Sequence, residues 1–205
     1  MTDLFASSAG LSPVHLVDAD VSYQVALDLG VAPERLLAEL IKDTPWRQED
    51  VVVWGKTFQQ PRLVAWYGDP GRTYRYSSIF LDPIPWTERL SDVKRKVEAV
   101  VGASFNSVLL NYYRDHNDSM GLHSDDEREL GPTPTIASVS LGAERTLIFK
   151  SKIDPNTKPV RLSLASGSLL IMKGNTQSNY KHGIAKETRR RGPRVNLTFR
   201  RIMIL

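Results

Sequence analysis

Residues 194–200 of this 205-residue chain read Arg194-Val-Asn-Leu-Thr-Phe-Arg200, with polar and apolar side chains in strict alternation. Successive side chains of a β-strand point to opposite faces, so this stretch predicts a strand with one polar and one apolar face. The apolar face is expected to pack in the core, and the polar face, with an arginine at each end, to line a cationic pocket. A strand whose polar face meets only solvent is the simpler alternative.

The rest of the C-terminal half is also predicted to be strands, at residues 107–113, 135–141, 145–149, 160–164 and 168–172, and the last strand is expected to run over 195–204. No long helical pattern interrupts them, and turn signals such as Leu141-Gly142 and Ser166-Gly167 separate them. Many short strands of this kind predict an antiparallel double-stranded β-helix, or jelly roll, that holds a site between its two sheets.

Two helices are predicted outside this core, at residues 31–42 and 87–101, each with apolar residues at helical spacing. Residues 1–30 show little pattern, and residues 51–80 contain β-prone pieces broken by glycine and proline. The length suits one domain. We therefore expect a mainly β protein with flanking helices.

Three residues in the C-terminal half have the chemistry of a metal site. His123-Ser-Asp125 places an imidazole and a carboxylate two positions apart, on one face of an extended chain, and His182 follows far downstream. Two neutral imidazoles and one carboxylate can occupy one face of an octahedral Fe(II) ion and leave three positions open for a co-substrate and O2. The short motif occurs by chance, but the later histidine and the arginine strand that follows it make the combination more specific.

The arginine strand fits this interpretation. A 2-oxo acid chelates a metal through its keto group and C1 carboxylate, so the far carboxylate of a dicarboxylate needs a planar cation such as Arg194. Asn111 and Tyr113, also two positions apart, are candidates for hydrogen bonds to the same anion, although asparagine and tyrosine in strands are as often structural.

Composition narrows the remaining possibilities. The chain has no cysteine, which excludes disulfides, thiolate zinc sites and cysteine nucleophiles. It has no apolar stretch of membrane-spanning length and no leader-like N-terminus, so we expect a soluble intracellular protein, cytoplasmic or nuclear. The net charge is +4, and basic residues gather at Lys186, Arg189, Arg190, Arg191 and Arg194. Such a cluster suggests a polyanion, and a solvated basic loop is the alternative.

Three motifs together resemble a known family. His123-Ser-Asp125-Asp-Glu127, Asn111-Tyr-Tyr113 and the 194–200 strand are similar to those of the AlkB-type Fe(II)/2-oxoglutarate-dependent dioxygenases. The resemblance covers about residues 109–201 and is closest to the nucleic-acid repair branch. Upstream, Gln60-Pro-Arg62 and residues 67–77 resemble the substrate lid of the demethylases in that family.

The resemblance implies a role for each matching residue. The implied iron ligands are His123, Asp125 and His182, and the implied 2-oxoglutarate-binding residues are Asn111, Tyr113, Arg194, Asn196 and Arg200. Arg200 would hold the metal-bound end of the co-substrate and border the substrate. The implied substrate residues are Glu127, Tyr76, Tyr74 and Arg62: Glu127 would favour a cationic methylated base, Tyr76 would stack on it, Tyr74 would lie near the backbone, and Arg62 would contact phosphate.

The implied organisation is a single catalytic domain over 1–205, with a helical extension at 1–50, a nucleotide-recognition lid at 51–86 and the jelly-roll core at 104–205. The implied activity is oxidative demethylation of N1-methyladenine or N3-methylcytosine in DNA or RNA by a monomer that uses Fe(II), 2-oxoglutarate and O2 and releases formaldehyde, succinate and CO2. A hydroxylase of a protein or small molecule on the same fold, and a noncatalytic nucleic-acid-binding module, are the alternatives.

Overall fold

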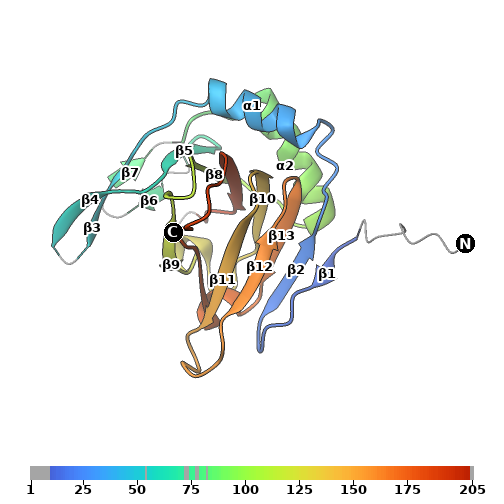
Figure 1. Ribbon diagram of the computed structural model, residues 1–205. Helices are drawn as coiled ribbons and strands as arrows, with labels where there is room; N and C mark the ends of the chain where they lie inside the picture. The colour runs from blue at the N-terminus through green and yellow to red at the C-terminus, as the bar shows by residue number, and fades with distance from the viewer. Residues whose placement is uncertain (1–9, 54, 72–73, 77–78, 82, 204–205) are drawn as a thin grey trace, which may run out of the picture.

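Two antiparallel sheets face each other, and two helices cover the outer side of the larger sheet (Figure 1). The computed structural model describes residues 10–53, 55–71, 74–76, 79–81 and 83–203, and of residues 51–53, 74–76 and 79–81 it describes the backbone alone. The helices are α1 (Pro33–Asp43), α2 (Glu88–Val101) and the single-turn α3 (Thr176–Asn179), with a 3-10 turn at Arg128–Leu130.

The larger sheet has seven strands in the order β1-β2-β13-β10-β15-β8-β5. They are β1 (Ser12–Pro13), β2 (Asp20–Gln24), β13 (Ser168–Lys173), β10 (Ile136–Gly142), β15 (Arg194–Arg200), β8 (Ser107–Tyr113) and β5 (Leu63–Gly68). The smaller sheet has the order β12-β11-β14-β9, formed by β12 (Val160–Leu164), β11 (Arg145–Ser151), β14 (Tyr180–Ile184) and β9 (Met120–His123). This pair of sheets is the predicted jelly roll.

Two apolar layers hold the sheets and helices together. One lies between the sheets and includes Phe149, Leu170 and Ile184. The other lies between the larger sheet and the helices, where α1 buries Leu36 and Leu40 and α2 buries Leu90, Val93, Val97 and Val101. The helix ends follow local chemistry: Pro33 starts α1, the Thr87 hydroxyl caps α2 by accepting a hydrogen bond from the Leu90 N–H, and Gly102 ends α2 in the left-handed region.

The alternation in residues 194–200 has the predicted consequence. Val195, Leu197 and Phe199 of β15 lie in the layer under the helices, and Arg194, Asn196, Thr198 and Arg200 point between the sheets. Because β15 pairs with β8 and β10 in the centre of the larger sheet, Arg194 lies opposite Tyr113 and Asn196 opposite Asn111. The strand ends at Arg200, earlier than the predicted residue 204.

The N-terminal half contains more of the sheet than the sequence pattern indicated. Residues 1–50 include α1, but β1 and β2 also extend the larger sheet beside β13. In the 51–86 segment, β5 belongs to the larger sheet, and two separate hairpins flank it: β3 (Asp50–Val53) with β4 (Lys56–Gln59), and β6 (Tyr74–Tyr76) with β7 (Ile79–Leu81). The β3–β4 hairpin projects from the body of the molecule (Figure 1). In the described part of the chain, no helix is long and apolar enough to cross a membrane.

Candidate active site

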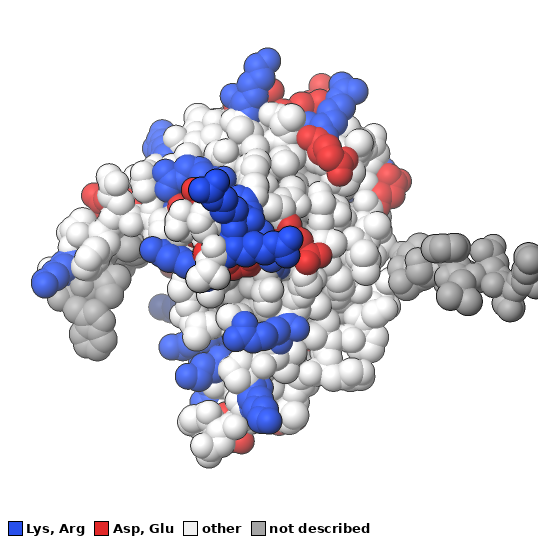
Figure 2. Space-filling model, in the orientation of Figure 1, with Lys and Arg blue, Asp and Glu red and all other residues white. Residues whose placement is uncertain are grey.

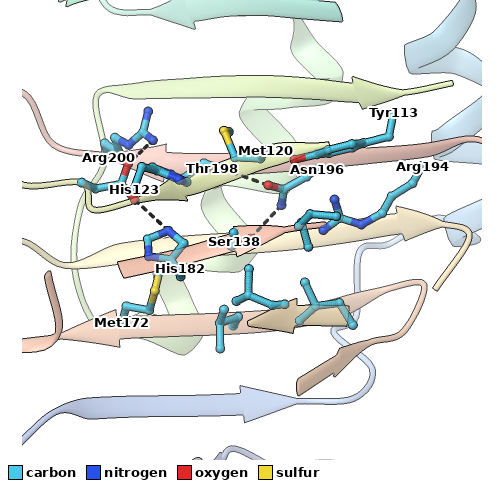
Figure 3. Close-up of a pocket in the computed structure, with 16 residues that line it drawn as sticks. Tyr113, Met120, His123, Ser138, Met172, His182, Arg194, Asn196, Thr198 and Arg200 are labelled. Atoms are coloured by element: carbon cyan, nitrogen blue, oxygen red, sulfur yellow. Dashed lines mark hydrogen bonds and ion pairs between the residues drawn. The ribbon is translucent and has the colours of Figure 1, made fainter. Parts of the chain in front are cut away.

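A pocket lies between the two sheets. Its two ends differ in chemistry. His123, His182 and Arg200 gather at one end, and Tyr113 and Arg194 lie at the other (Figure 3). The walls between them combine the polar Ser138, Asn196 and Thr198 with apolar side chains, which are Met120, Leu147, Leu164, Leu170, Met172 and Ile184.

At the first end, strand pairing brings the three predicted metal ligands together. His182 of β14 lies directly opposite His123, the last residue of β9, and the ring centroids are 4.5 Å apart. Asp125 follows two residues later, and its Oδ2 lies 3.6 Å from His182 Nε2. One donor atom from each of the three residues lies within 4.8 Å of the others. The cluster thus presents two imidazoles and a carboxylate to one small volume, as a facial metal site requires.

Arg200 stabilises the ionised form of the Asp125 carboxyl. Both side chains are almost completely buried, and Arg200 Nη2 donates a hydrogen bond to Asp125 Oδ1. Burial alone would raise the pKa of Asp125, but the charge of Arg200 and the contact with His182 hold it well below its usual range. The other carboxylate oxygen, Oδ2, has no hydrogen-bond donor among the described residues and faces the histidines. It is therefore available to a metal ion.

His123 is kept neutral by its surroundings. Burial, together with the nearby His182, lowers its pKa to about 4. Its Nδ1 lies 3.0 Å from the Gly121 carbonyl oxygen, which favours a proton on Nδ1 and leaves Nε2 free. A neutral imidazole with a free ring nitrogen is the form that binds metal.

At the other end of the pocket, Arg194 is a buried cation with spare hydrogen-bond donors. Its side chain is 1% exposed, and Nη2 donates to Ser140 Oγ at 2.9 Å. Its Nε and Nη1 have no hydrogen-bond acceptor among the described residues, and its Cζ lies 5.0 Å from the centroid of the Tyr113 ring. Burial lowers the pKa of Arg194, as expected for a charge without a counter-ion. These unpaired buried donors fit a carboxylate.

Asn196 connects the two ends. Its Nδ2 donates to Ser138 Oγ at 2.7 Å and to the Val139 carbonyl at 3.0 Å, and its Oδ1 accepts from Thr198 Oγ1 (Figure 3). Asn111, expected to join the same set, is not among the residues that line the pocket. Its Oδ1 instead accepts a hydrogen bond of 2.7 Å from Arg62 Nε.

The expected substrate residues lie in different environments. Arg62 is 4% exposed and contacts Asn111 and the Ser119 carbonyl, so its guanidinium is not part of an exposed basic rim. Glu127 is half-buried, two residues after Asp125, at the start of the 3-10 turn. Tyr74 and Tyr76 lie in β6, and their side chains are outside the described residues.

The basic cluster divides into three parts. Lys186, Arg189 and Arg190 are exposed, Arg191 pairs with Glu187 at 2.6 Å, and Arg194 is inside the pocket. Lysine and arginine also gather on the face of the molecule shown in Figure 2, over the smaller sheet and the segment above it. The charged side chains in this part of the surface are mostly Lys and Arg.

Two buried residues near the site were not anticipated from the sequence. Gln177 of α3 accepts a hydrogen bond of 2.9 Å from the Asp125 N–H and so fixes the backbone of that residue. Arg145 is 1% exposed and lies close to Tyr113. A signal for Arg145 was present, because it is in phase with Leu147 and Phe149, whose side chains point inward from β11.

Comparison with known proteins agrees with this geometry. Residues 32–200 match the model of the 2OG-Fe(II) oxygenase superfamily. The chain is 43% identical over 175 residues to the human protein named "Alpha-ketoglutarate-dependent dioxygenase alkB homolog 3", an alignment that covers 82% of this chain and 60% of that protein. It is 41% identical over 208 residues to human "DNA oxidative demethylase ALKBH2", covering 96% and 79% respectively.

Among solved structures, that of OsALKBH1 superposes with a TM-score of 0.62 at 19% identity, covering 92% of this chain and all of that one, which supports the fold. The chain spans about 60% of the length of the mouse and human alkB homolog 3 proteins. The family match over most of the chain and the identity to these relatives establish that this chain belongs to the 2OG-Fe(II) oxygenase superfamily and, within it, to the AlkB homologues.

Proposed function

We propose that the protein is an Fe(II)- and 2-oxoglutarate-dependent demethylase of N-alkylated bases in DNA or RNA. One observation carries the proposal: a His-Asp-His cluster, in which Asp125 and His182 are buried, shares a pocket with a buried arginine that has unpaired donors. The names of the relatives, a DNA oxidative demethylase among them, support the nucleic-acid substrate.

The donor set fits the metal and the co-substrate. His123, Asp125 and His182 would hold Fe(II), and Arg194 with Tyr113 would hold the far carboxylate of 2-oxoglutarate, with Asn196 beside its chain. With iron, 2-oxoglutarate and O2 bound, oxidative decarboxylation of 2-oxoglutarate to succinate and CO2 would use one oxygen atom of O2, and the other would hydroxylate an N-methyl group. The hydroxymethylated base then loses formaldehyde, which restores the base.

The protein's own residues position and protect the reacting groups. Arg200 keeps the Asp125 carboxyl ionised, and Gln177 fixes its backbone. The apolar walls of the pocket would limit water around a bound metal ion. Because the hydroxymethyl adduct decomposes by itself, no strong general base is needed.

The substrate assignments belong to the same proposal. Glu127 would favour a cationic methylated base by its charge, and Tyr76 and Tyr74 would contact the flipped nucleotide. The two hairpins within 51–86, which lie outside both main sheets, would form the lid, and β5 would anchor them to the core. The exposed Lys186, Arg189 and Arg190 would contact phosphates.

A coupled assay tests the function. Formaldehyde and succinate are measured with Fe(II), 2-oxoglutarate, ascorbate and an oligonucleotide that contains N1-methyladenine or N3-methylcytosine, and Asp125→Ala serves as the control. We expect both products from the wild type and neither from the variant. Succinate without base restoration on DNA or RNA would place the substrate among proteins or small molecules. Absence of both products would leave a noncatalytic nucleic-acid-binding module.

A further inference from the structure

Arg145 is a buried cation to which the proposed chemistry gives no role. It is the first residue of β11, its side chain is 1% exposed, and it points inward with Leu147 and Phe149. A buried charge is costly unless hydrogen bonds and a counter-ion compensate it, so its contacts indicate what it does.

The Arg145 guanidinium joins two loops. It donates to the carbonyl oxygens of Asp115 at 3.1 Å and Asp118 at 3.0 Å, both in the loop 114–119. It also donates to the Ala185 carbonyl at 2.6 Å and to Glu187 Oε1 at 3.2 Å, both in the loop 185–193. Three of these partners are backbone atoms, so the planar fork of donors fixes the course of both loops.

These loops connect the two ends of the pocket. Loop 114–119 runs from Tyr113, at the end of β8, to β9, which carries His123. Loop 185–193 runs from β14, which carries His182, to Arg194 at the start of β15. The loops also meet directly, because the Glu187 N–H donates to the His116 carbonyl at 3.0 Å.

Arg145 also lies close to the proposed co-substrate end of the pocket. Its Cζ lies 5.7 Å from the centroid of the Tyr113 ring, and Arg194 Cζ lies 5.0 Å from the same centroid. The ring is therefore held by two guanidinium groups, a favourable arrangement for both. Any movement of Arg145 would therefore disturb the ring that lies beside Arg194.

We propose that Arg145 is a positioning residue for the far carboxylate of the co-substrate, acting through Tyr113 and the two loops that it joins. The proposal rests on the proposed function only in placing that carboxylate at Arg194 and Tyr113. It predicts a selective effect: loss of Arg145 weakens the binding of a 2-oxo dicarboxylate and leaves the metal end intact. A residue that only stabilised the fold would weaken every ligand alike.

Calorimetric binding to the Mn(II)-loaded protein without O2 separates these cases. The two ligands are 2-oxoglutarate and 2-oxobutyrate, which has no far carboxylate. The variants are Arg145→Gln, Arg145→Lys and Arg194→Gln, and Arg161→Gln is the matched control, because Arg161 is exposed on the neighbouring strand β12. Mn(II) affinity is measured for each variant.

We expect Arg145→Gln to raise the Kd of 2-oxoglutarate about tenfold or more, which equals about 1.4 kcal/mol, and to change the Kd of Mn(II) and 2-oxobutyrate less than about threefold. Arg145→Lys, which keeps the charge but not the fork, should show the same selective loss at a smaller size. Arg161→Gln should match the wild type.

Equal weakening of both 2-oxo acids, or an unchanged Kd of 2-oxoglutarate in a folded variant, would overturn the proposal. If Arg145→Gln does not fold, Arg145→Lys decides, and a wild-type Kd in that variant would overturn it too. Arg194→Gln tests the underlying placement separately. If Arg194→Gln keeps the wild-type preference for 2-oxoglutarate over 2-oxobutyrate, the proposed co-substrate site is wrong. If Arg194→Gln loses this preference and Arg145→Gln keeps it, the co-substrate site stands and only the role of Arg145 is wrong.

Discussion

At the scale of single residues, burial has opposite effects on two of the proposed iron ligands, Asp125 and His123. Burial would favour a neutral Asp125, but Arg200 overcomes it, so the carboxylate remains charged. For His123 burial acts in the useful direction, because it favours the neutral imidazole. The site therefore holds Asp125 and His123 in their metal-binding forms over the neutral pH range.

The lowered pKa of His123 predicts how the stability of the metal-free protein depends on pH. Between pH 6.5 and about 4, the folded state binds fewer protons at His123 than the unfolded chain does, so the free energy of unfolding falls as pH decreases across this window. One proton limits this contribution to about 1.4 kcal/mol per pH unit. Asp125 adds to this fall only at the acidic end of the window, because its carboxyl in the unfolded chain begins to bind protons near its ordinary pKa of 3.8.

Denaturant unfolding of chelator-treated protein at several pH values measures this contribution. His123→Gln should unfold with a shallower pH dependence than the wild type, and His15→Gln, which changes a histidine outside the pocket, should keep the wild-type slope. Equal slopes for the wild type and His123→Gln would contradict the prediction.

Tyr113 and Tyr112 are adjacent in β8 but point to opposite faces, and they provide a second test at this scale. Tyr113 lines the pocket, and Tyr112 packs against Trp46 with ring centroids 5.2 Å apart. Tyr113→Phe removes only a hydroxyl, so the KM for 2-oxoglutarate should rise by about threefold to tenfold, the effect of one hydrogen bond. Tyr112→Phe should leave this KM unchanged. If both variants behave alike, the hydroxyl of Tyr113 does not contact the co-substrate.

At the scale of elements, a strand with clear alternation over seven residues could be predicted from the sequence, and several shorter strands could not. The Arg194–Arg200 strand was anticipated, including the side on which each residue lies, because its pattern has a period of two. Strands β9 and β14, which carry both histidines, were not anticipated, since each is short and contains a glycine. Strand β2 was also missed: its sequence Asp-Val-Ser-Tyr-Gln alternates, but over only five residues, and the strand is defined by its pairing with β13.

The same limit applies to the site. The ligand residues were recognised from their types and spacing, and the partners of these residues were not. Gln177 reaches Asp125 only because α3 lies next to the segment that follows β9, and Arg145 contacts backbone carbonyls that carry no sequence signal. Contacts with backbone atoms depend on the tertiary structure.

The turn between β10 and β11 offers a prediction for an element. Gly142 has φ of +89°, and an added Cβ would lie 2.4 Å from the Pro193 carbonyl oxygen, next to Arg194. Gly102 at the end of α2 has φ of +70° and open space around it. Gly102→Ala should therefore lower the free energy of unfolding by about 1–2 kcal/mol, the cost of placing an alanine in the left-handed conformation. Gly142→Ala should lower the free energy of unfolding by more than this. It should also raise the KM for 2-oxoglutarate, because Pro193 must move.

Thermal unfolding and steady-state kinetics of the two glycine variants test this prediction. The comparison isolates the effect of crowding, since both positions lie in the left-handed region. Equal loss of stability in the two variants, with an unchanged KM in Gly142→Ala, would show that the turn adapts without moving Arg194.

At the scale of the whole molecule, the two sheets separate the tasks of the site. Strands β9 and β14 of the smaller sheet supply the histidines, and strands β8 and β15 of the larger sheet supply Tyr113 and Arg194. The site is thus complete only when the sheets are packed together. A third task, the proposed binding of phosphates, falls to the outer surface. The exposed basic residues that would perform it lie on the loop that leads directly into β15.

This surface predicts the salt dependence of oligonucleotide binding. Each phosphate contact in a single strand contributes about −0.7 to the slope of log K against log salt, so Lys186, Arg189 and Arg190 replaced together by glutamine should reduce its magnitude by about 2. A control with the same net charge replaces Arg35, Lys42 and Arg95, exposed on α1 and α2, and should leave the slope nearly unchanged. Fluorescence anisotropy at several salt concentrations gives the slopes. Equal changes in the two triple variants would mean that net charge alone attracts the nucleic acid, and no change in the first would remove the loop 185–193 from the phosphate-binding surface.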